Sequence, residues 1–128
     1  MELNFNDVVP IYIQIADAIE DDILSGRLAV GEPCYSQIVL AKELGINPAT
    51  AGKGIRLLVE RGVLEKVRGQ AMHIREDAPD TIRKRKKADT LTKQVQELVQ
   101  EAKKLEISEK ELLQWVKSEY EEEKGKNE

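Results

Sequence analysis

The fold is decided by residues 47–74, which read NPATAGKGIRLLVERGVLEKVRGQAMHI. Asn47 is a favourable N-cap, because its side-chain oxygen accepts a hydrogen bond from a free backbone N–H at a helix start. Pro48 suits the first helical position, where no N–H is needed. Apolar residues then recur at helical spacing as far as Gly62, a residue type that tolerates the left-handed conformation found after many helices. The pattern predicts a helix over residues 48–61.

A small hairpin is expected after this helix. The runs 63–67 and 72–75 predict two strands, and Arg68 and Gly69 predict the turn between them. A capped helix that leads into a small basic hairpin is typical of the second half of a winged helix-turn-helix. In that motif one helix enters the major groove of DNA and the hairpin lies beside it.

The residues before position 47 supply the first half of the motif. An apolar stripe predicts a helix over residues 10–25, with isoleucines at Ile11, Ile15, Ile19 and Ile23. Ser36 can cap a short helix that ends at Leu44, and residues 45–47 form a tight turn that contains glycine. Two helices joined by such a turn have helix-turn-helix spacing. The predicted fold class is mainly α with a small β-hairpin: a winged helix-turn-helix, followed by a two-helix dimerisation segment.

That second segment contains two amphipathic helices, predicted over residues 80–105 and 109–120, the latter opened by a capping box at Ser108 to Glu111. An apolar stripe of this length needs a partner. A second copy of the same helices is the simplest partner, which predicts a homodimer; the alternative is that they fold back on the first domain. The predicted dimerisation residues are Leu91, Val95, Leu98, Ala102, Leu105, Leu112, Leu113, Trp115 and Val116.

The chain is therefore expected to have three parts. We predict a DNA-binding domain over residues 1–76, a helical dimerisation segment over residues 77–120 and a disordered tail over residues 121–128, where charged residues predominate.

Charge along the chain favours a nucleic-acid partner. The net charge is −4, yet residues 35–75 carry seven cations and three anions, whereas residues 1–34 carry one cation and seven anions. Local rather than total charge attracts phosphates, although chance segregation would give the same pattern. We predict double-stranded DNA as the partner.

Helical periodicity selects the residues that face this partner. It turns Ala51, Ile55, Leu58 and Val59 inward and Lys53 and Arg56 outward, with Ala49 placed for a thymine methyl and Thr50 for a phosphate. The hairpin residues are expected to probe phosphates or a minor groove, the alternative being a solvated turn. The predicted DNA-binding residues are Ser36, Asn47, Ala49, Thr50, Lys53, Arg56, Lys66, Arg68, Gly69 and Gln70.

Two features allow more than one explanation. Gly52 and Gly54 are weak helix formers inside a predicted helix; they either permit close approach of its backbone to DNA or lie on an exposed helix that tolerates them. Residues 83–87 are five consecutive cations, which bind nucleic acid or form a solvated face that pairs with acidic residues.

Other function classes lack support. His73 and Cys34 are the only histidine and cysteine, so no metal site is predicted, and no catalytic constellation or cofactor motif is found. Cys34 is expected to be a small apolar residue of a loop. No apolar run approaches the roughly 18 residues that span a bilayer, and no signal peptide is recognised, which predicts a cytoplasmic protein without membrane association.

The chain resembles the GntR family of bacterial transcription regulators over about residues 8–75. The matching positions are Pro10–Ile15, Ile23–Leu28, Gly31, Ser36, Leu40–Ala41, Leu44–Thr50 and Gly62–Leu64. The short C-terminal part looks like the YtrA subfamily, whose members dimerise through it and commonly sit with ATP-binding-cassette transporter genes. The resemblance implies a homodimeric regulator, expected to be a repressor of a two-fold symmetric operator, with a transporter operon as an expected target. Any small-molecule effector is unknown.

The chain departs from the family pattern at three places. Relatives usually carry DNA-contacting arginines where this chain has Ile38 and Gly52, and the wing pattern is degraded over residues 68–72. These departures support an alternative function, a dimeric protein-interaction module that kept the winged-helix fold but lost specific DNA reading. Ile38 is considered a candidate for recruitment into the core.

Overall fold

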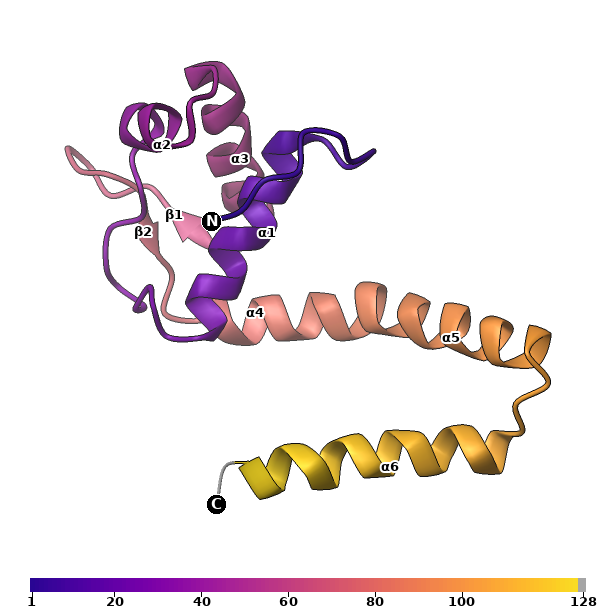
Figure 1. Cartoon of the computed structure of the whole chain (residues 1–128). Coiled ribbons are helices and arrows are strands. Elements are labelled where there is room, and N and C mark those ends of the chain that lie inside the picture. Colours follow the sequence, from indigo (N-terminus) through magenta and orange to yellow (C-terminus); the bar gives the residue numbers. More distant parts are fainter. Residues whose placement is uncertain (127–128) are drawn as a thin grey trace. The chain divides into compact units, whose positions relative to one another are not determined.

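A computed structural model of the chain describes residues 1–126, and the side chains of residues 1–125. Figure 1 labels the elements along the chain. The chain divides into two compact units, one formed by Met1–Arg85 and the other beginning at Lys86. No helix among the described residues has the length and apolar character needed to cross a membrane.

The first unit has the expected winged helix-turn-helix elements. They are α1 (Ile11–Leu24), α2 (Gln37–Leu44), α3 (Pro48–Glu60), β1 (Leu64–Glu65), β2 (His73–Ile74) and α4 (Ala78–Arg85). Helix α3 packs against both α1 and α2. The predicted inward stripe of α1 forms the centre of the core, where Ile15 and Ile19 are fully buried beside Leu58 of α3.

The predicted caps explain why the helices start and end where they do. Ser36 Oγ accepts a hydrogen bond from the backbone N–H of Val39 at 3.2 Å, and Asn47 Oδ1 accepts one from Ala49 at 2.8 Å. Gly45 and Gly62 follow α2 and α3 with φ of 64° and 76°, values that glycine adopts without steric cost. The helices predicted over residues 10–25, 36–44 and 48–61 are confirmed.

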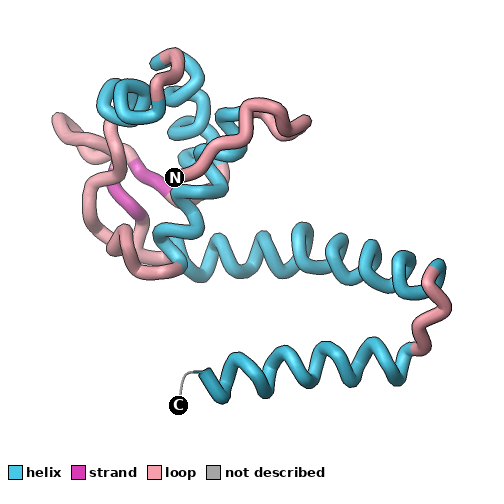
Figure 2. Tube along the Cα trace, in the orientation of Figure 1, coloured by secondary structure: helices cyan, strands magenta, loops and turns pink. Residues whose placement is uncertain are grey.

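The hairpin is present but shorter than predicted. The antiparallel ladder pairs only Leu64 with Ile74 and Glu65 with His73 (Figure 2). The backbone of the second strand is partly engaged elsewhere: the carbonyl of Met72 accepts from Cys34 at 2.7 Å, and that of Ile74 accepts from the Gly31 N–H at 2.7 Å. The loop at residues 31–34 thus occupies backbone groups on the strand edge away from β1.

The domain boundary lies further along the chain than the predicted position 76. Ala78 and Ile82, one helical turn apart on α4, are both fully buried in the core of the first unit. Helix α4 therefore completes the first unit, and the boundary falls after Arg85.

The second unit contains η1 (Lys86–Leu91), α5 (Thr92–Lys104) and α6 (Glu109–Lys126). The helix predicted over residues 80–105 is thus interrupted, because η1 is a π-helix. Ser108 Oγ accepts from the Glu111 N–H at 3.1 Å, which is the predicted N-cap bond of the capping box.

Helix α6 also extends past the predicted end at position 120. The disordered tail predicted from position 121 is wrong for residues 121–126, which are helical. They are mostly Glu and Lys, which are good helix formers. Residues 127–128 lie outside the described part of the chain.

Candidate nucleic-acid interface

The two helices of the helix-turn-helix are joined near their N-terminal ends. Gln37 Nε2, in the first turn of α2, donates a hydrogen bond to the carbonyl of Pro48, the first residue of α3, at 2.9 Å. This contact holds the first turns of the two helices together. Both turns present exposed side chains, among them Ile38 and Ala49.

The outward face of α3 matches the periodicity. Ala49, Lys53 and Arg56 are exposed and Thr50 is half-buried, whereas the inward residues Ala51, Ile55 and Leu58 are buried. The expectation for Val59 is wrong, because its side chain is 38% exposed. Val59 lies one residue, about 100° of helical rotation, past Leu58, and so falls at the edge of the packed stripe.

A contact with α1 restrains one of these cations. Lys53 Nζ lies 5.0 Å from the centroid of the Tyr12 ring, a cation–π arrangement. The carbonyl oxygen of Tyr12 lies against Gly54, which belongs to α3 like Lys53. Helix α1 therefore positions a predicted DNA-contacting side chain. Sequence periodicity does not reveal this contact, because it depends on how the two helices pack.

The two glycines inside α3 have a packing role, and both earlier explanations for them are wrong. Gly52 and Gly54 are buried. A Cβ on Gly54 would lie 3.0 Å from Ile15 Cγ2 and 3.1 Å from the Tyr12 carbonyl oxygen. A Cβ on Gly52 would lie 2.8 Å from Gln37 Cδ. The missing side chain of Gly54 allows α3 to approach α1 closely, whereas Gly52 is covered by the end of the flexible Gln37 side chain.

The hairpin turn presents the predicted wing residues to solvent. Lys66, Arg68, Gly69 and Gln70 are all exposed. Gly69 has φ of 72°, and the Gln70 N–H closes the turn on the Val67 carbonyl at 3.0 Å. The wing therefore forms a tight turn with a cation at its tip.

A charge cluster lies at the base of the wing. Arg75 Nε donates to Asp77 Oδ1 at 3.0 Å, and Arg75 also lies 3.8 Å from Glu65. The hydrogen bond to Asp77 raises the pKa of Arg75, and the same bond lowers the pKa of Asp77. Arg75 is thus engaged with acidic neighbours of its own chain.

Of the remaining predicted contacts, Ser36 and Asn47 are exposed but are used as helix caps. Ile38 is not recruited into the core: its side chain is 74% exposed. Among the described residues, no group of three or more His, Cys, Asp or Glu side chains is arranged to hold a metal ion. Cys34 is buried, as expected for a small apolar residue, and burial raises the pKa of its thiol to about 11.

The first unit also contains a charge network around a buried glutamate, which was not predicted from the sequence. Glu20 of α1 is fully buried, and its Oε1 accepts hydrogen bonds from Arg61, at 2.8 Å, and from Arg85. Its position gives a signal, since Glu20 lies one turn after the buried Ala16 on the inward face of α1. An acid on such a face requires a cationic partner.

The network also bears on the cationic run at residues 83–87. Arg85 binds Glu20, and Arg83 lies 3.4 Å from the exposed Asp80. For these two residues, pairing with acidic side chains is the explanation that the structure favours.

The second unit carries an exposed apolar surface. Most of the predicted dimerisation residues are exposed; the exceptions are Ala102, which is buried, and Leu112, which is half-buried. A groove of about 440 Å³ between α5 and α6 is lined mainly by apolar side chains, among them Leu98 and Leu113.

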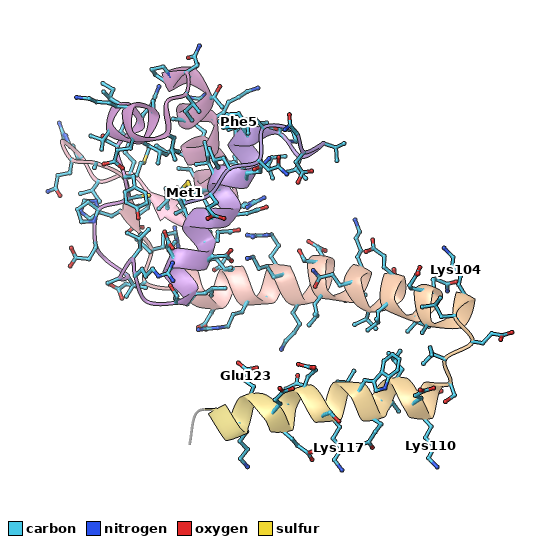
Figure 3. All side chains as sticks on the ribbon, in the orientation of Figure 1. Met1, Phe5, Lys104, Lys110, Lys117 and Glu123 are labelled. Atoms are coloured by element: carbon cyan, nitrogen blue, oxygen red, sulfur yellow. The ribbon has the colours of Figure 1, made fainter. Side chains whose placement is uncertain are left out.

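Helix α6 also carries cations: Lys110 and Lys117, about two turns apart, project from the same side of this helix (Figure 3).

Known proteins share both the sequence pattern and the fold. Residues 11–74 match the model of a family described as bacterial regulatory proteins, gntR family. The regulator YhcF of Bacillus subtilis is 31% identical over 92% of this chain and 96% of that protein. The transcriptional repressor YtrA of Bacillus subtilis is 29% identical over 84% of this chain and 82% of that protein.

Solved structures agree. A GntR family transcriptional regulator from Listeria monocytogenes has a TM-score of 0.72 at 30% identity, covering 89% of this chain and 98% of that one. By contrast, the chain spans only 28% and 29% of the lengths of two longer curated relatives.

Proposed function

The chain belongs to the GntR family of bacterial regulatory proteins, and we propose that it is a DNA-binding transcription regulator rather than an enzyme and that it acts as a homodimer on a two-fold symmetric operator. We further propose that it represses transcription in the cytoplasm. The similarity to YtrA, itself a repressor, supports that direction of regulation. A transporter operon as its target is a weaker part of the proposal.

The main support for a DNA-binding surface is the exposed, outward face of α3. Ala49, Lys53 and Arg56 are exposed along one side of a helix whose opposite side is buried in the core. In this proposal α3 enters the major groove, where Lys53 and Arg56 contact guanine edges or phosphates and Ala49 contacts a thymine methyl. The segment that contains α3 is also the only one with a positive net charge among residues 1–34, 35–75 and 76–128.

The wing completes the proposed surface. The exposed turn at residues 66–70 carries Lys66 and Arg68, and no acidic residue interrupts it. Placed beside α3, these two cations would neutralise phosphates and so strengthen binding to any duplex without reading its sequence.

Dimerisation is proposed to cover the apolar surface of the second unit. Val95 and Leu98 of α5 and Leu113 and Trp115 of α6 are each 46% to 59% exposed. A second copy offers the same apolar surface, and an isologous contact would bury both at once. Two DNA-binding units related by a two-fold axis then require an operator with matching symmetry.

The test is binding of the full chain to a fragment of its own promoter and to random DNA at the same salt concentration. We expect the promoter fragment to bind at least about a thousandfold more tightly, as specific regulators do. Equal affinities would contradict the proposal and favour the interaction module. Ile38 supports this alternative, the interaction module, because an isoleucine that is 74% exposed supplies no charge for phosphate.

A further inference from the structure

The first turn of α2 borders the exposed stripe of α3. Gln37 Nε2 donates a hydrogen bond to the Pro48 carbonyl at 2.9 Å, and the end of the same side chain covers Gly52, where an added Cβ would lie 2.8 Å from Gln37 Cδ. Pro48 and Gly52 are four residues apart and so share one stripe of α3. Ala49 and Lys53 each follow by one position, about 100° of helical rotation, and both are exposed. The first turn of α2 therefore lies beside the surface that is proposed to enter the major groove.

Ile38 is the most exposed apolar side chain of α2. It is 74% exposed, compared with 49% for Val39, whereas Leu40 and Ala41 are buried in the core. Ile38 directly follows Gln37, whose side chain is bonded to α3, so its backbone is held next to the proposed DNA-binding surface. An isoleucine that is left in water gains free energy when it is buried against another apolar group.

A cation shares the face of α2 that carries Ile38. Lys42 lies four residues further along the helix, which places it on the same face, and it is exposed. Val39, by contrast, is followed four residues later by the exposed Glu43. Phosphates attract a cation and repel a carboxylate, so the face with Ile38 and Lys42 suits DNA and the face with Val39 and Glu43 does not.

The chemistry of isoleucine limits what Ile38 can recognise in a major groove. Its side chain neither donates nor accepts hydrogen bonds, and the apolar group that bases display there is the C5 methyl of thymine. The edges of the other bases present donors and acceptors, which would lose water without gaining a partner if an isoleucine covered them. Contact with Ile38 therefore favours thymine over the other three bases.

We propose that Ile38 is a specificity-determining residue, which packs against the methyl group of a thymine beside the bases that α3 contacts. An uncharged side chain at this position then contributes to sequence reading instead of to phosphate binding. The inference rests on the proposed function, since it requires a chain that binds DNA through α3.

The test uses the full chain and a duplex that the wild-type chain selects from a random DNA library. Each thymine in one half of this duplex is replaced in turn by uracil, which removes the C5 methyl and keeps the hydrogen-bonding groups of the base. Affinities are measured for the wild type, for Ile38→Ala and for Val39→Ala. Val39→Ala is the matched control, because Val39 is an exposed apolar residue of the same helical turn.

For the wild type and Val39→Ala, we expect one thymine at which uracil weakens binding about fourfold, the value expected for the loss of one buried methyl group. Ile38→Ala should bind the duplexes with thymine and uracil at that position equally well, because alanine is too short to cover the methyl group. A thymine that is contacted by Ala49 should instead show the same uracil effect in the wild type and in both variants.

Thermal melts establish that the variants are folded. If Ile38→Ala is unfolded, Ile38→Gln takes its place, because glutamine keeps the length of the side chain but ends in an amide. It should likewise show no difference between thymine and uracil at the position that Ile38 contacts.

The outcomes separate this proposal from the proposed function. A wild-type chain that selects no sequence overturns both. A selected duplex at which every uracil affects the wild type and Ile38→Ala equally, or affects neither, overturns only the role of Ile38. A uracil effect that is lost in Val39→Ala as well as in Ile38→Ala also overturns that role, because the effect would then not be specific to Ile38.

Discussion

Nearly all of the buried apolar residues belong to the first unit, whereas most of the apolar residues of the second unit are exposed. Ile15, Ile19 and Leu58 are fully buried within residues 1–85, whereas Leu98 and Leu113 of the second unit are 46% and 59% exposed. The first unit has a core of its own and is expected to fold alone. The second unit is expected to gain most of its burial from a partner.

The largest expected effect comes from replacing one leucine in each unit with alanine and comparing the two variants. Leu58→Ala should lower the free energy of unfolding by about 2–5 kcal/mol, because it leaves a cavity in a packed core. Leu98→Ala should leave the first unit's stability unchanged and weaken self-association. Urea unfolding and sedimentation of both variants provide the measurement. A Leu98→Ala variant as unstable as Leu58→Ala would show that the second unit folds back on the first.

A second pair of variants compares a glycine inside a helix of the first unit with one inside a helix of the second. Gly54→Ala should destabilise the protein by about 1–2 kcal/mol, because the new Cβ meets Ile15 Cγ2 and the Tyr12 carbonyl at 3.0 and 3.1 Å, despite the better helix propensity of alanine. Gly125→Ala in α6 is the control, since nothing lies within 4 Å of its added Cβ. It should be neutral or slightly stabilising. Thermal melts measure both, and a stabilised Gly54→Ala would refute the packing role.

Within the first unit, two cations should differ in what they read. Lys53→Ala should cost about 1–3 kcal/mol on the operator and much less on random DNA, if Lys53 contacts a base. Arg68→Ala should weaken binding to every sequence and lower the salt slope by about 1, as expected for a phosphate contact. Salt titrations of DNA affinity test this pair. Unchanged binding by both variants would favour the interaction module.

A smaller effect concerns the thiol buried in the first unit. Burial raises the pKa of the Cys34 thiol from 9.0 to about 11. Below pH 9 the thiol is protonated in both the folded and the unfolded chain, so it does not lower the free energy of unfolding. Between pH 9 and pH 11 the free energy of unfolding falls, because only the unfolded chain releases the proton. At pH 10 the unfolded chain has released this proton and the folded chain has kept it, which lowers the free energy of unfolding by roughly 1 kcal/mol. Urea unfolding at pH 8 and pH 10 should show a smaller decline for Cys34→Ala than for the wild type. Equal declines would exclude the Cys34 contribution.

Features fixed by neighbouring residues could be predicted from the sequence. The caps at Ser36 and Asn47, the glycine-containing turn at residues 45–47 and the left-handed Gly62 each depend on a few adjacent residues, and all four are present. The outward face of α3 follows from helical geometry in the same way.

Features that depend on packing between distant elements could not be predicted. Gly54 owes its role to the packing of α1 against α3, and the partners of Glu20 come from two other regions of the chain. The boundary after Arg85 depends on the burial of α4 in a core built by earlier helices. Periodicity identifies which residues are apolar or charged but not which distant residues they meet.

We propose that this chain binds DNA as a two-fold dimer held by its second unit. Sedimentation of the full chain with a labelled symmetric duplex, selected by the wild type from random DNA, tests it most directly. We expect two chains per duplex, formed in a single step, and a loss of that species in Leu98→Glu, which places a charge in the proposed interface. One chain per duplex, or a Leu98→Glu variant that still binds as a pair, would contradict it.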